Sequence, residues 1–162
     1  MAIRILVTGG TFDKVHDPIT EKLVFQETHL PDILKRSRHL LDITVRTIML
    51  IDSLEITLGD QEMILKACQD AVEDEIVITH GTSNMEKTAQ FLGEKIKDKT
   101  VVLTGAMVPY VFRVSDAFFN IGAALAFVQT LPHGVYITMN GKIFNWDNVK
   151  KNTELGIFEK IN

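Results

Sequence analysis

The sequence predicts an α/β protein with a doubly wound, mostly parallel sheet, a three-layer sandwich of the flavodoxin or Rossmann kind. Three observations support this fold class. Short runs rich in β-branched residues recur along the chain, helical apolar patterns separate these runs, and threonine-glycine segments follow two of them. Strand and helix alternation of this kind is typical of a parallel sheet covered by helices on both faces.

Five runs are predicted as parallel strands that are covered on both faces, because they are almost continuously apolar: 3–7, 44–51, 76–79, 101–104 and 135–139. Apolar residues at helical spacing lie between these strands: Ile33, Leu34, Leu40 and Leu41; Ile64, Ala67, Cys68 and Ala71; Met85, Ala89, Leu92 and Ile96; Phe119, Ala123 and Phe127. Asn140-Gly141 tolerates positive φ at both positions, so a small C-terminal β-hairpin is expected, with 142–144 as its second strand. Residues 13–28 lack a clear period and are expected to form a mobile loop over the site.

Composition limits the possible classes of protein. With 162 residues, 46% hydrophobic and 23% charged, the chain is expected to form a single domain over 1–162. A net charge of -4, with no block of lysine and arginine, disfavours nucleic acid as a partner. Cys68 is the only cysteine, Met1-Ala2 leads directly into the first strand, and no apolar run has the length of a membrane helix, so we expect a cytoplasmic protein that does not bind membranes.

Two threonine-glycine segments carry the functional signal: Thr8-Gly9-Gly10-Thr11 and Thr79-His80-Gly81-Thr82. Each follows a predicted strand, and open parallel sheets bind ligands at the carboxyl ends of their strands. Two hydroxyl groups beside free backbone N–H groups suggest acyl transfer, which needs an attacking oxygen and donors for an oxyanion.

Simpler interpretations of these segments stay open. Gly9-Gly10 also fits a tight turn or a phosphate-binding turn, but it lacks the G-x-G-x-x-G spacing, so a nicotinamide cofactor is disfavoured. Ser83 and Glu86 fit a helix capping box. His80 is expected to be a packed or backbone-bonded residue rather than a base. The scattered histidines have no metal-ligand spacing, and neither a metal nor another cofactor is expected.

Five blocks, in order, resemble the bacterial-type L-asparaginase family and cover nearly the whole chain. They are Thr8 to Thr11; Asp52-Ser53; Thr79 to Thr82 with Met85-Glu86 and Thr88-Ala89; Gly105-Ala106-Met107; and Ser115-Asp116 with Asn120. The resemblance is to the larger N-terminal domain of the family. Typical members carry a second α/β domain after it, which this protein is expected to lack.

The resemblance implies a role for individual residues. Thr11 matches the nucleophile that attacks the side-chain amide of asparagine, and Thr82 matches the second catalytic threonine. The family lysine falls on Lys151, with Lys150 as the alternative register. A threonine hydroxyl needs a base, and a lysine desolvated between helices would supply one. Substrate contacts are implied for a further group of residues: Gly10, Ser53, Gly81, Ser83 and Ala106.

Three departures from the family pattern affect these roles. Ser83 stands where the family has an aspartate that pairs with the substrate ammonium, so binding of an α-amino acid should be weaker. Asp116 and Glu55 are candidates to replace that charge. No tyrosine occurs in 12–28, where His16 or Asp17 would substitute for it. The missing domain normally contributes to a neighbouring subunit's site, so a homo-oligomer is expected.

The function that these observations favour is an amidohydrolase that cleaves the side-chain amide of L-asparagine, or of a related small amide, to the acid and ammonia through a threonine acyl-enzyme. An alternative is a catalytically weak or inactive amino-acid-binding module, or a subunit of a larger assembly. A nucleotide-binding protein that uses Gly9-Gly10 ranks last, because it leaves the segment from Thr79 to Thr82 without a task.

Overall fold

The computed structural model describes residues 1–162 and is built on a six-stranded sheet with the order β4-β1-β5-β6-β7-β8. The five predicted parallel strands are confirmed, and their bounds are β1 Ala2–Gly9, β4 Asp42–Ile51, β5 Glu75–Thr79, β6 Thr100–Thr104 and β7 Gly134–Met139. β8 (Lys142–Asn145) pairs antiparallel to β7. Numbered among the parallel strands alone, the order is 2-1-3-4-5, so the direction of winding reverses between β1 and β5.

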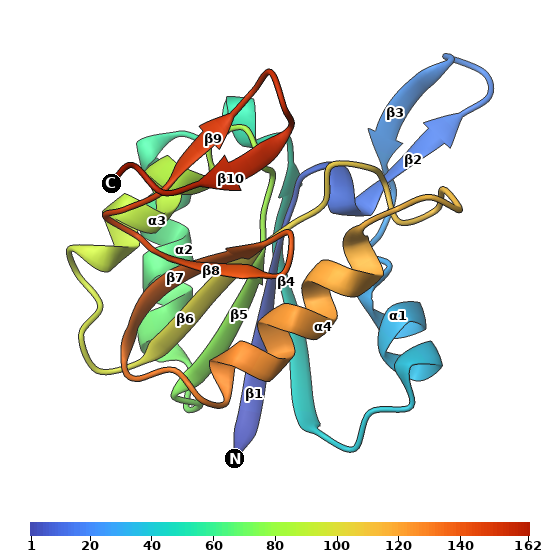
Figure 1. Cartoon of the computed structure of the whole chain (residues 1–162). Coiled ribbons are helices and arrows are strands. Elements are labelled where there is room, and N and C mark those ends of the chain that lie inside the picture. The colour runs from blue at the N-terminus through green and yellow to red at the C-terminus, as the bar shows by residue number, and fades with distance from the viewer.

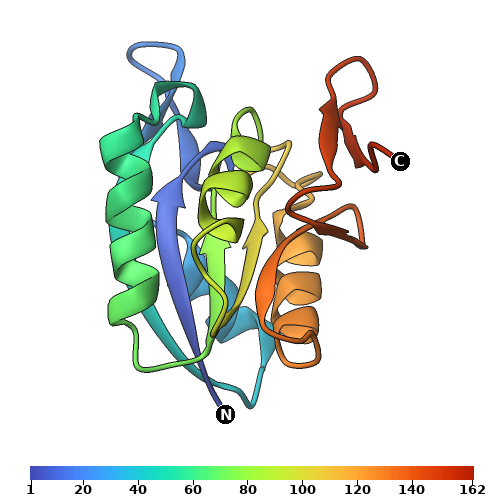
Figure 2. The same ribbon diagram turned by 90° about the vertical axis from the view of Figure 1, so that its left-hand side faces the viewer.

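Four helices cover the two faces of the sheet: α1 Leu30–Ser37, α2 Leu58–Asp70, α3 Met85–Gly93 and α4 Ala117–Val128. α2 and α3 lie side by side on one face, while α1 and α4 lie on the other, as Figures 1 and 2 show. Each interface has its own core, one of 18 and one of 15 buried residues. The predicted doubly wound sandwich is therefore confirmed. None of the helices has the length and apolar character needed to span a bilayer.

Three β-hairpins extend this layered body. The predicted hairpin between β7 and β8 is confirmed, and its turn residues Asn140 and Gly141 have φ of 57° and 74°. Two further hairpins are not predicted by the sequence pattern: β2 (Lys14–Asp17) with β3 (Lys22–Phe25), and β9 (Lys150–Asn152) with β10 (Ile157–Glu159). The segment 13–28, expected to be an irregular loop, is thus largely a hairpin that projects from the molecule (Figure 1).

Two of the helical predictions place apolar residues wrongly. Leu40 lies beyond the end of α1 and is fully exposed. In α4 the buried face contains Ala117, Ile121 and Ala124, whereas Phe119 is 63% exposed. α4 is apolar on every side, so its periodicity does not select one face.

The strand β4 also differs from its prediction. Its sequence is that of a strand covered on both faces, yet it forms the edge of the sheet and none of its residues is buried. β1, β5, β6 and β7 are mostly buried.

Candidate active site

The ends of β1 and β5 meet where the winding of the sheet reverses, which is where open α/β sheets bind ligands. Gly9 and Gly10 both have positive φ, at 101° and 76°, and Gly10 N donates to Ile51 O at 2.9 Å. A Cβ on Gly10 would lie 2.4 Å from the Cα of Gly81. The two strand ends are therefore in backbone contact, and the residues that follow them, Thr11 and Thr82, leave from adjoining points.

Ser53 packs against the same glycine. It begins a short 3-10 helix, η2 (Ser53–Glu55), after β4, and it is 1% exposed. A Cβ on Gly81 would lie 2.5 Å from Ser53 Oγ, so the hydroxyl occupies the space that a side chain at position 81 would need. Asn84 Nδ2 donates to Ser53 O at 2.8 Å. The structure thus brings Gly10, Gly81 and Ser53 together.

Lys151 reaches this group of residues from the C-terminal hairpin. Its Nζ donates to Thr82 Oγ1 at 2.8 Å, and Thr82 is 6% exposed. Burial lowers the pKa of the Lys151 ammonium, while the Glu86 carboxylate opposes that shift. The lysine lies on β9 and not between helices, so that part of the prediction is wrong.

The two neighbouring lysines make different contacts. Lys150 is exposed, and its Nζ forms an ion pair with Glu159 at 3.3 Å. Lys151 N donates to Glu86 Oε2 at 2.8 Å, which fixes the backbone of β9 against α3. Lys151 is therefore the lysine that contacts the threonine.

The predicted capping box at α3 is wrong. The N-cap residue is Asn84 and makes no side-chain capping bond, while Glu86 bonds to β9 instead of returning to the helix start. Ser83 lies one residue earlier, is exposed and makes no side-chain hydrogen bond within the chain. The contact between Glu86 and Lys151 joins residues far apart in sequence, and no local pattern signals it.

Thr11 opens the 3-10 helix η1 (Thr11–Asp13) and is half-buried. The next two residues anchor the segment, because Phe12 is fully buried and Asp13 accepts from Thr28 Oγ1 and His29 N. Ala106 follows β6, is 1% exposed, and belongs to the same apolar cluster as Phe12. Burial raises the pKa of Asp13 despite those hydrogen bonds.

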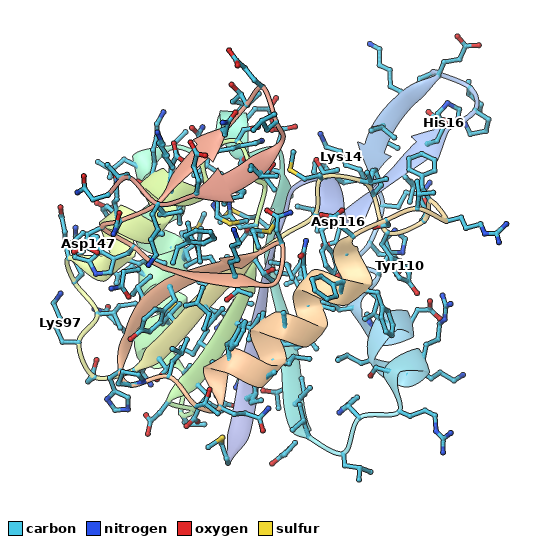
Figure 3. All side chains as sticks on the ribbon, viewed as in Figure 1. Lys14, His16, Lys97, Tyr110, Asp116 and Asp147 are labelled. Carbon is cyan, nitrogen blue, oxygen red and sulfur yellow. The ribbon has the colours of Figure 1, made fainter.

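One of the two carboxylates proposed to replace the missing aspartate, Asp116, is engaged elsewhere. Asp116 Oδ1 accepts from Met107 N and Val108 N, both at 3.0 Å, and its Oδ2 accepts from Asn120 Nδ2 at 2.9 Å. Figure 3 shows Asp116 at the start of α4. Asp116 therefore holds the loop after β6 and does not stand in for a charge at Ser83.

The substitutes proposed for the loop tyrosine lie on the projecting hairpin. His16 is exposed on β2, away from the sheet, as Figure 3 shows. Asp17 caps the hairpin turn through Ile19 N and Thr20 Oγ1. Lys14, on the same strand, forms an ion pair with Asp52 at 2.5 Å and ties the hairpin to the segment that holds Ser53.

His80 is fully buried, as expected of a packed residue. Its Nδ1 lies 2.7 Å from Gly81 O, and burial lowers its pKa to about 4, so the ring is neutral at pH 7. No cluster of three or more His, Cys, Asp or Glu residues has the arrangement of a metal site. The surface hollows of the chain are lined by other residues and include neither Thr11 nor Thr82.

The fold and this threonine-lysine pair define a class: a doubly wound α/β protein with a hydroxyl and an amine in contact beyond its strand ends. The chain belongs to the asparaginase family, because residues 2–162 match the family model described as "Asparaginase, N-terminal".

Known relatives agree with this assignment. The chain is 33% identical over 172 residues to an L-asparaginase of Thermococcus kodakarensis and 32% identical over 178 residues to L-asparaginase 2 of Escherichia coli. Those alignments cover 100% and 99% of this chain, but 52% and 49% of the relatives. The chain therefore spans about half the length of these relatives.

Solved structures give the same result. The thermostable L-asparaginase of Thermococcus kodakarensis superposes with a TM-score of 0.89 at 31% identity, over 100% of this chain and 52% of the other. A probable cytoplasmic L-asparaginase of Campylobacter jejuni superposes with a TM-score of 0.79 at 31% identity, over 98% of this chain and 51% of the other.

Proposed function

We propose that the protein is an amidohydrolase that releases ammonia from L-asparagine or a related small amide. The observation that carries the proposal is the hydrogen bond from Lys151 Nζ to Thr82 Oγ1 at the end of β5. Burial lowers the pKa of Lys151, which favours the neutral amine that a general base requires. The relatives named L-asparaginase support the choice of substrate class.

In the proposed reaction, Thr11 Oγ1 attacks the carbonyl carbon of the amide. The hydroxyl proton passes to the leaving nitrogen through the base at Thr82 and Lys151, the C–N bond breaks, and ammonia leaves. Water then cleaves the threonine ester and releases the acid. The backbone contact between Gly10 and Gly81 supports these roles for Thr11 and Thr82, because it brings the two threonines to adjoining positions.

Substrate contacts are proposed for the residues that surround the threonines. Ser53, packed on Gly81, would bind the substrate carboxylate, and Ala106 would line the amide end. Ser83 is exposed and uncharged, so an α-ammonium group would find no carboxylate at this position. We therefore propose that small amides without an α-amino group, such as succinamate, are used well relative to asparagine.

An ammonia-release assay with L-asparagine, L-glutamine and succinamate tests the proposal. We expect turnover by the natural protein and loss of turnover by Thr11→Ala. Thr130→Ala, an exposed threonine beyond the end of α4, is the matched control and should leave turnover unchanged. Undiminished turnover by Thr11→Ala would remove the nucleophile, and a strong preference for asparagine over succinamate would overturn the argument from Ser83.

The second candidate function is an amino-acid-binding module with little or no turnover, or a subunit of a larger assembly. The exposed Ser83 favours it, because Asp116, one candidate to replace the missing carboxylate, is engaged in holding the loop after β6. Calorimetry with asparagine and aspartate, beside the ammonia assay, separates the two functions. Saturable binding without turnover would favour the module.

We further propose a homo-oligomer in the cytoplasm. The similarity to the probable cytoplasmic L-asparaginase of Campylobacter jejuni supports this location. Light scattering on the purified protein tests the homo-oligomer, and fractionation of the source cells tests the location.

A further inference from the structure

The outer edge of β4 is the largest unpaired hydrogen-bonding surface of the sheet. β4 is ten residues long, pairs only with β1, and none of its side chains is buried. Figure 2 shows the strand at the end of the sheet opposite to β7. A long edge strand rich in β-branched residues is a template for another strand, and natural proteins usually shorten, block or cover such an edge.

The sequence of β4 is complementary to itself when two copies of the strand pair antiparallel. In an antiparallel pair centred on Thr44, Asp42 of one copy faces Arg46 of the other. The same register places Ile43 opposite Val45 and Thr44 opposite its own counterpart. Opposite charges and β-branched residues directly across an antiparallel ladder are favourable pairs.

Asp42 and Arg46 are free to make that contact. Both side chains are exposed, and neither forms an ion pair within the chain. Because a two-fold axis repeats each contact, two Asp42–Arg46 pairs would form for every pair of chains.

The continuation of the register explains a fully exposed leucine. Two residues before the strand, Leu40 would face Ile48 of the second copy. Ile48 lines a hollow of about 250 Å³ between β4 and α2, together with Arg46 and Met63, and Met63 is 50% exposed. Leu40 of one copy would thus enter a hollow of the other in which Ile48, Met63 and Ala67 offer apolar surface beside Lys66 and Asp70, and this contact buries apolar surface that each copy alone leaves in water.

We propose that two copies of this chain associate through β4 in an antiparallel, two-fold arrangement centred on Thr44, so that the two sheets become continuous. This names the surface of the homo-oligomer proposed above and does not depend on the amidohydrolase activity. The occupant of the edge is a second copy because the strand complements itself in charge and in shape.

Charge-reversal variants test the surface. In Arg46→Asp, aspartates at positions 42 and 46 oppose each other across the axis, and in Asp42→Arg, arginines do. Analytical ultracentrifugation should show self-association weakened by about tenfold or more in each single variant, because attraction becomes repulsion at two places.

Mixing the two single variants provides the decisive result. Asp42→Arg contributes arginines at 42 and 46 and Arg46→Asp contributes aspartates, so a mixed dimer regains both ion pairs. We expect the mixture, and the double variant, to associate like the natural protein. Such recovery would not follow from simple misfolding.

Lys142→Asp on β8, the opposite edge strand, is the matched control and should associate normally. A natural protein that is monomeric across the micromolar range would overturn both the oligomer and its surface. An oligomer that Arg46→Asp leaves intact, or a mixture that fails to associate, would overturn the surface alone. Ammonia release serves as a separate readout, so failure of the catalytic proposal is seen independently.

Discussion

The strand ends that carry Thr11 and Thr82 touch through two glycines. A methyl group on Gly10 would lie 2.4 Å from backbone atoms of Gly81, and φ of 76° adds strain for any L side chain. We expect Gly10→Ala to lower the free energy of unfolding by about 2 kcal/mol or more. Urea unfolding followed by circular dichroism measures the change.

Gly122 on α4 provides the opposite case. No atom lies within 4 Å of a Cβ at this position, and the backbone is helical. Gly122→Ala should therefore stabilise the protein by about 0.5–1 kcal/mol. Equal effects of the two substitutions would contradict the close approach at Gly10.

The protonation of Lys151 should set the pH dependence of turnover. Burial lowers its pKa from the usual 10.5, so the neutral amine becomes more abundant as the pH rises toward that lowered value. We expect kcat to rise with pH up to a plateau. Lys151→Met should reduce kcat by about a hundredfold or more, whereas Lys150→Met should not.

Substitution of Glu86 tests the direction in which the pH profile of kcat should move. Its carboxylate raises the pKa of Lys151, so Glu86→Gln should lower that pKa further and move the rising limb of the kcat profile to lower pH. The amide oxygen of glutamine still accepts from Lys151 N. A limb that stays in place or moves to higher pH would separate the profile from Lys151.

Residues near a strand end were predictable from the local pattern, whereas Lys151 was reached only through the family resemblance and the contact of Glu86 with β9 was not predicted. Gly10, Thr11, Gly81 and Thr82 each follow a strand whose apolar run is visible in the sequence. The partnership of Glu86 with β9 joins segments 65 residues apart. The location of Lys151 on a strand was also missed, because β9 is only three residues long and has no apolar pattern.

At the scale of elements, the β9–β10 hairpin determines where Lys151 lies. Phe158 faces Lys151 in the ladder and is 2% exposed within the core shared with α2 and α3. We expect Phe158→Ala to cost about 3 kcal/mol of stability and to reduce turnover more than the unfolded fraction explains. Unfolding curves and ammonia release measured on the same samples provide the test.

Leu155→Ala is the control for this hairpin, because Leu155 lies in its turn and is 67% exposed. Leu155→Ala should change neither the free energy of unfolding nor the rate of ammonia release. Full activity of folded Phe158→Ala would show that the hairpin keeps Lys151 in place without this anchor.

The elements that sequence reasoning misplaced share a cause. β2–β3 and β9–β10 are two-stranded, and Phe158 is the one buried residue of their strands, so burial imposes no strong alternation on them. α4 is apolar all round, and β4 has the composition of a covered strand. In α4 and β4 the sequence pattern shows that the residues are apolar but does not indicate whether another element covers them.

At the scale of the whole molecule, the burial of His80 makes the free energy of unfolding depend on pH. Its pKa is lowered to about 4 by complete burial, whereas an unfolded histidine titrates near 6.5. The unfolded chain binds the proton first as the pH falls below 6.5, so acid favours unfolding. Between pH 6.5 and 4 this one group should remove on the order of 3 kcal/mol of stability.

The free energy of unfolding of the natural protein and of His80→Gln, measured across this pH range, checks the contribution. The difference between them should shrink or change sign on acidification, because the variant lacks the titrating ring. Asp13 has a raised pKa and acts in the opposite direction, but it is common to both proteins. Parallel curves for the two proteins would assign the acid sensitivity to other groups. That residues 1–162 form a single domain stays a prediction.

The bond between Lys151 and Thr82 spans 69 residues of chain. On the ribosome, the segments that carry Thr11 and Thr82 are made well before β9, so a nascent chain that stops short of β9 would contain both threonines while still lacking the amine. Chemistry at this edge would begin only after Lys151 had been made.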